Sequence, residues 1–219
     1  MRHSSRKVTI LTPQSDTAIC SSAEWAAIFR RKGKIKNFHI ARSQNGIFIG
    51  ASGVSGVERR LDSKKITFNI QNSSFVDCSE TCLEISHNCS VEVKNTFFRG
   101  GYKFSEESNK SFLIKIHGSE VFFHDCHFQN SQKMIFIGPN SKVFFIGCKF
   151  SVGDIGVVAS GSQYPLKDQF FLGKGPTIVH FSGTNVHKMQ TLCRIETGAA
   201  ALIEDRHKNI SFLDGGVYL

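Results

Sequence analysis

A pattern of eight apolar and polar positions recurs six times along the chain. In each copy the first, third and eighth positions are apolar, the fifth is Asn, Asp or Gly, and the sixth is small. Alternation of this kind is typical of a strand with one buried face. Because Asn, Asp and Gly tolerate a left-handed backbone, the fifth position predicts a sharp bend between two strands. The copies begin at Phe68, Val91, Val121, Val143, Val179 and Ile210.

Each copy is too short to bury its own apolar face, and successive copies start 22 to 36 residues apart. Repeats of this spacing are typical of a solenoid, in which each coil covers the next. A third short strand precedes several copies, at residues 83–85, 114–116 and 135–137. Three short strands per coil, stacked so that equivalent residues form ladders, predict an all-β chain folded as a right-handed, single-stranded parallel β-helix.

Two copies show the pattern most clearly. Val121–Phe128 and Val143–Phe150 both carry phenylalanine at the third and eighth positions and cysteine at the sixth. In these features the chain resembles the pectin-lyase-like superfamily over residues 35–219. That superfamily includes polysaccharide lyases and hydrolases, phage tailspikes and capsid-decorating viral proteins, so the resemblance implies the fold and leaves the function open.

The amino-terminal segment lacks the repeat. Residues 1–34 are predicted to form a tail, a strand and a short helix that caps the first coil, and residues 35–219 the β-helix. Ser21 and Glu24 have the spacing of a capping box, which favours the start of a helix. Such a helix would cover the exposed ladder at the end of the solenoid. Its apolar residues would be Trp25, Ile28 and Phe29.

Composition limits the compartment. With 219 residues and 40% apolar content, the chain is long enough to build one substantial core. No stretch has the eighteen apolar residues of a membrane span, and residues 1–7 lack the apolar segment of a signal peptide. Seven cysteines with no compact disulfide spacing favour free thiols in a reducing compartment. An intracellular or virion location is therefore expected.

The net charge is +9, which favours an acidic partner. Basic residues cluster at 30–36 and 59–65, both near the amino terminus. Neither cluster is interleaved with the aromatic residues on which single-stranded nucleic acids stack. A solvated, charged end of the molecule is therefore preferred over a nucleic-acid site. If the basic clusters bind a partner, an acidic neighbouring protein is expected.

No catalytic residues can be assigned. Enzymes of the resembled superfamily carry several carboxylates on neighbouring coils, whereas this chain has no Asp-Asp pair and no Gly-His-Gly motif. The cofactor prediction is likewise none. A lyase, a hydrolase or a glycan-binding protein remains the alternative function, with a groove along the third strand. Its candidate residues are Glu84, His87, Arg99, Lys115 and His117.

The cysteines raise a separate question about metal. Cys78, Cys82, His87 and Cys89 are ligand types suited to zinc, but their spacing is not that of a usual zinc motif. No metal site is assigned, and binding by the three cysteines is left open. Elsewhere, the repeat register places Cys126 and Cys148 inward, where they are expected to be buried thiols.

The most informative outward residues lie at the second position of two adjacent copies. Phe122 and Phe144 are expected to stack outside the cylinder, with Ile146 nearby. Exposed apolar residues that adjoin usually mark an interface. The sequence therefore favours a non-enzymatic structural protein that binds copies of itself or a larger complex. Among homo-oligomers, the resemblance to trimeric viral spikes implies a trimer. These three residues would anchor the interface.

Overall fold

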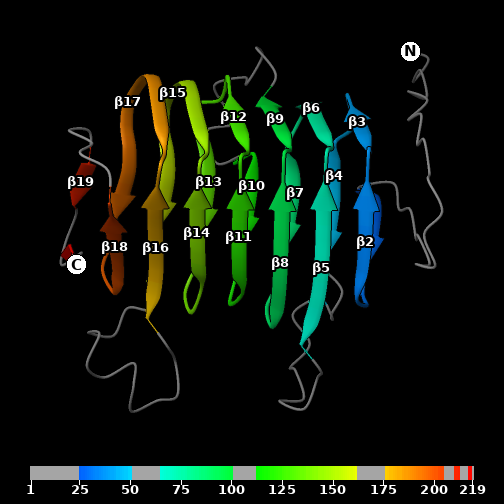
Figure 1. Cartoon of the computed structure of the whole chain (residues 1–219), viewed down its shortest axis with the longest axis horizontal. Coiled ribbons are helices and arrows are strands. Elements are labelled where there is room, and N and C mark those ends of the chain that lie inside the picture. Colours follow the sequence, from blue (N-terminus) through cyan, green and yellow to red (C-terminus); the bar gives the residue numbers. More distant parts are fainter. Residues whose placement is uncertain are drawn as a thin grey trace, which may run out of the picture.

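A computed structural model describes residues 25–50, 65–100, 112–161 and 176–204, with the backbone alone of 210–212 and 217–218. Every strand pairing in it is parallel, and the coils lie side by side from the first to the last (Figure 1). These residues form a parallel β-helix, which confirms the predicted all-β solenoid. No helix occurs in the described ranges, and hence none long and apolar enough to cross a membrane.

The first strands of the coils make an eight-stranded sheet. Its members pair in the order in which they follow one another along the chain. They are β2 (Gly33–Lys36), β5 (Ile66–Gln71), β8 (Cys89–Lys94), β11 (Glu120–His124), β14 (Lys142–Ile146), β16 (Thr177–Ser182), β18 (Ala199–Ile203) and β20 (Val217–Tyr218).

The second and third strands share a twelve-stranded sheet, because two long strands run through both positions. These long strands are β15 (Lys149–Ala159) and β17 (Asn185–Ile195). The second position also holds β3 (His39–Ala41), β6 (Ser74–Cys78), β9 (Phe97–Gly100) and β12 (His127–Gln129). The third holds β1 (Trp25–Phe29), β4 (Asn45–Ile49), β7 (Thr81–Ile85), β10 (Ile114–Ile116), β13 (Lys133–Ile137) and β19 (Ile210–Phe212).

Two ladders of phenylalanine fill the cylinder. Rings at the third repeat position stack at 5.1–5.2 Å between centroids, and those at the eighth stack at 4.8–5.4 Å. The ladders meet edge to face, as aromatic pairs prefer. The first ladder is Phe123, Phe145 and Phe181; the second is Phe75, Phe98, Phe128 and Phe150.

The bend between the first two strands has the predicted backbone. The Asn, Asp and Gly residues of five copies all have φ between 48° and 63°, at Asn72, Asn95, Asp125, Gly147 and Gly183. The next residue in each copy is buried and small. In two copies its hydroxyl donates to the carbonyl two residues earlier, at 2.9 Å for both Ser73 and Thr96. This local bond explains why small polar residues recur at the bend.

Two sequence predictions are wrong. Trp25, Ile28 and Phe29 lie in strand β1, not in a capping helix, because β1 pairs with β4 and already belongs to the first described coil. Residues 21–24 lie outside the described residues. The sixth copy is also misplaced: Ile210 pairs with Cys193 of β17, in the third-strand position. The strand that continues the eight-stranded sheet after β16 is instead β18.

Candidate functional site

The outer face of the eight-stranded sheet changes character along the stack. Strand alternation turns every second side chain outward, and parallel register aligns these side chains between coils. Along the stack, this face is polar on the early coils, which carry Lys34, and largely aromatic or aliphatic on the later coils. The central line of outward residues is Lys34, Asn69, Glu92, Phe122, Phe144, His180 and Leu202.

Five side chains form an apolar patch on this face: Phe122, Phe144, Ile146, Ile178 and Leu202. The rings of Phe122 and Phe144 stack with centroids 4.6 Å apart and planes 7° from parallel. Ile146 and Leu202 are 37% and 38% exposed, and the other three are partly exposed. The predicted trio of outward residues is thus brought together on adjacent strands, as the repeat register implied.

Ion pairs border the patch. Glu92 lies 2.7 Å from Lys94 and 3.8 Å from Nε2 of His124, and Lys65 lies 2.8 Å from Glu120. His180 lies between Phe144 and Leu202 in the register; its ring meets Phe144 edge to face, and it is 3.0 Å from Glu204. An apolar centre with a polar, exposed rim is the usual anatomy of a protein interface.

The glycan candidates separate into two places. Glu84 pairs in register with Lys115, and Lys115 pairs with Phe136, on the third strands of neighbouring coils. His87 and His117 follow these strands, with ring centroids 6.1 Å apart. Arg99 does not join this group.

Glu84 is a partly buried carboxyl group in register with Lys115. Burial raises its pKa, and the charge of Lys115 opposes that shift. Arg99 instead lies on β9 and pairs with Asp77 at 3.2 Å. Four of the five glycan candidates thus lie on, or directly after, the third strands of two neighbouring coils.

The six cysteines that the structure describes are buried. Contact with the Cys78 thiol, followed by burial, raises the pKa of Cys82. The Cys89 thiol instead faces the carbonyl oxygens of Ile49 and His87. Among the described residues, no group of three or more His, Cys, Asp or Glu side chains could hold a metal ion.

Cys126 and Cys148 lie inside the cylinder, as their repeat position predicted. Both are at most 1% exposed, and each thiol contacts a carbonyl oxygen in the preceding coil, at 3.4 Å. Burial, followed by contact with Cys148, raises the pKa of Cys126. A solvent-excluded, protonated thiol is a structural residue and not a nucleophile.

Sequence reasoning missed two members of the patch. Ile178 precedes the first position of its copy by one residue, so it lay outside the eight-residue pattern. Extending the pattern by that one outward position would have revealed it. Leu202 was missed because its strand, β18, was not recognised as part of a coil.

Comparison with protein-family models, with curated proteins and with solved structures finds no significant match to this chain.

Proposed function

We propose that this protein is a non-enzymatic β-helix that assembles, through its apolar patch, with copies of itself or with a larger complex. The observation that carries the proposal is the partly exposed stack of Phe122 and Phe144, with Ile146 beside it, on a rigid sheet. Association would remove these side chains from water, at about 25 cal/mol per Å² of apolar surface. Stacked aromatic rings lose little conformational entropy on binding, because neighbouring strands already hold them in place.

The repeats resemble those of the pectin-lyase-like superfamily, whose members include trimeric viral spikes and capsid-decorating proteins. A virion-type or intracellular assembly of this kind needs a stiff scaffold with an exposed apolar face. Among homo-oligomers we favour a trimer.

Light scattering after size-exclusion chromatography tests the proposal. The wild-type chain, kept in reductant, is expected to elute as a trimer or larger closed assembly at both low and high salt, because apolar burial is not screened by ions. The double variant Phe122→Asp/Phe144→Asp is expected to weaken association at least about 100-fold, since buried aromatic anchors contribute about 2 kcal/mol or more each.

The matched control is Phe97→Asp/Phe136→Asp, which makes the same chemical change at partly exposed aromatic residues of the twelve-stranded sheet. It should leave the assembly intact. Circular dichroism must show both variants folded. A folded Phe122/Phe144 variant with the mass of the wild type would remove this proposal.

Glycan binding is the second candidate function, and the partly buried Glu84 beside Lys115 is the observation that favours it. The rings of His117 and Phe136, 5.7 Å apart, would supply a surface for a sugar ring. A panel of acidic polysaccharides, with and without calcium, tests binding and the absorbance of unsaturated products.

The variant Glu84→Gln/His117→Ala should bind about ten-fold more weakly or worse, which corresponds to about 1.4 kcal/mol. The control variant Arg99→Gln, on another strand, should bind as the wild type does. Absence of both binding and product would leave the assembly function as the single candidate.

A further inference from the structure

The whole net charge of this protein comes from its first 65 residues. They contain thirteen basic and four acidic residues, whereas residues 66–219 contain fourteen of each. The described residues of this segment belong to one end of the solenoid, since consecutive coils stack in chain order. A charge so unevenly distributed creates a strong local potential even though most of the molecule is neutral.

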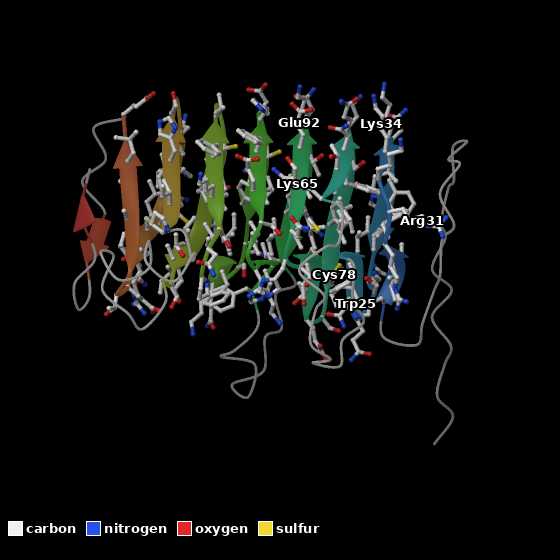
Figure 2. All side chains as sticks on the ribbon, turned by 90° about the horizontal axis from the view of Figure 1, so that it is seen from below. Trp25, Arg31, Lys34, Lys65, Cys78 and Glu92 are labelled. Carbon is white, nitrogen blue, oxygen red and sulfur yellow. The ribbon has the colours of Figure 1, made fainter. Side chains whose placement is uncertain are left out.

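The first described coil concentrates this charge. Residues 25–50 contain six basic residues and no acidic residue. Lys34 and Lys36 point outward from β2, and the turn from β1 into β2 adds three more cations. In Figure 2, Arg31 and Lys34 lie at the same end of the stack. The five cations Arg30, Arg31, Lys32, Lys34 and Lys36 are all exposed, and we call them the cationic coil.

No close ion pair among the described residues involves the cationic coil. The nearest outward residues on β5 are the uncharged amides Asn69 and Gln71, and the next carboxylate, Glu92, pairs with Lys94. The pKa of Lys34 is lowered, chiefly by the charge of Lys36, so these cations repel each other.

The adjoining sequence is itself net positive. Residues 1–24 and 51–64 each contain three basic and two acidic residues, so each adds positive charge. A ligand with several regularly spaced negative charges would relieve the repulsion within the cationic coil.

Residues 33–40, which carry Lys34 and Lys36, expose no large apolar side chain. Ile35, Phe38 and Ile40 all point into the core and are at most 6% exposed. A protein partner would need buried apolar or aromatic contacts at the centre of the interface, and a single-stranded nucleic acid would need aromatic rings for its bases. A duplex needs neither, because its phosphate backbone can be bound by cations alone.

We propose that the cationic coil binds the phosphate backbone of a double-stranded nucleic acid without reading its sequence. The rigid β2 strand presents Lys34 and Lys36 on one face, and the turn before it presents three further cations toward the end of the cylinder. The edges of the base pairs are not contacted, so the affinity depends on the number of phosphates that are neutralised. This site is separate from the apolar patch, which lies on later coils.

Fluorescence anisotropy with a 20-base-pair labelled duplex, titrated at several salt concentrations, tests this proposal. With four to five phosphate contacts, affinity is expected to fall roughly 150- to 500-fold between 50 and 200 mM salt. The variant Lys34→Gln/Lys36→Gln should lose about two contacts, which reduces the slope of log affinity against log salt by about 1.8. Its affinity at 50 mM salt should fall about ten-fold or more.

The control variant Lys142→Gln/Lys149→Gln has the same net charge, but its exposed lysines lie on β14 and β15. It should bind the duplex within about two-fold of the wild type. Equal losses in the two variants, or no binding at 50 mM salt, would overturn the proposal. Stronger binding of polyglutamate or of a single strand would also overturn it, since the partner would then be another class of molecule.

The result is independent of the proposed assembly, because Phe122→Asp/Phe144→Asp should bind the duplex through an unchanged cationic coil.

Discussion

Replacing Phe145 by alanine is expected to lower the free energy of unfolding by about 3–5 kcal/mol. Phe145 is fully buried at the centre of one aromatic ladder, with ring centroids 5.2 Å from Phe123 and 5.1 Å from Phe181. It also meets the second ladder edge to face, at Phe128 and Phe150. Because the two ladders lock each other in place, the coils cannot collapse into the space left behind, and a cavity remains.

Urea denaturation followed by circular dichroism measures this effect, at a protein concentration low enough that the chains are dissociated, because Phe144 is also a proposed interface anchor. The matched control is Phe144→Ala, which removes the same kind of side chain from the preceding residue of the same strand. Phe144 points outward and is partly exposed, so its loss should cost about 1 kcal/mol or less. Similar losses at the two positions would contradict the inward and outward assignment of this strand.

That assignment is the part of the fold that sequence predicted best. Alternation within each copy has a period of two, so it separates inward residues such as Phe145 from outward ones such as Phe144 without knowledge of their partners. The bend position was equally informative, because a left-handed backbone restricts the residue types that fit there. Both signals are local, and both repeat from coil to coil.

The two errors concern elements whose identity depends on distant partners. Trp25, Ile28 and Phe29 have helical spacing, but Trp25, Ala27 and Phe29 equally fit one side of a strand. Pairing with β4, twenty residues later in the chain, selects the strand. Strand β18 escaped notice because its inward residues include Ala199 and Ala201, which do not look like a ladder of large side chains.

The candidate sites also differ in how well the sequence predicted them. Glu84 and Lys115 were placed together from the repeat register alone, and the structure confirms that they are partners on adjacent strands. Arg99 was grouped with them although it lies on a second strand, β9, which belongs to another side of the cylinder. The position of a residue within its coil decides on which side of the cylinder it lies. The sequence defines that position clearly within the eight-residue repeats and less clearly between them.

Replacing Gly46 by alanine is the second change expected to damage the protein, at about 3 kcal/mol of unfolding free energy, the upper end for overpacking. A Cβ at this position would overlap the carbonyl oxygen of Cys82 in the neighbouring coil and lie 3.0 Å from its carbonyl carbon. These are backbone atoms within the ladder that joins β4 to β7, where Asn45 pairs with Thr81 and Ile47 with Leu83. The strands could move apart only by breaking these pairings.

The control for this change is Gly183→Asn, at a glycine with φ of 61° whose Cβ would have no atom closer than 3.7 Å. Asn72 and Asn95 occupy the equivalent bend in earlier coils at φ of 50° and 48°, so asparagine fits this backbone. Stability should change by about 0.5 kcal/mol or less, because the loss of chain entropy in the unfolded state offsets the small remaining strain. Urea denaturation of both variants compares two glycines. At Gly46 a neighbouring backbone leaves no room for a side chain, and at Gly183 the positive φ favours glycine or asparagine. If Gly46→Ala were as stable as Gly183→Asn, the close contact between β4 and β7 would not exist in solution, and the first coils would have to stack more loosely than the rest of the cylinder.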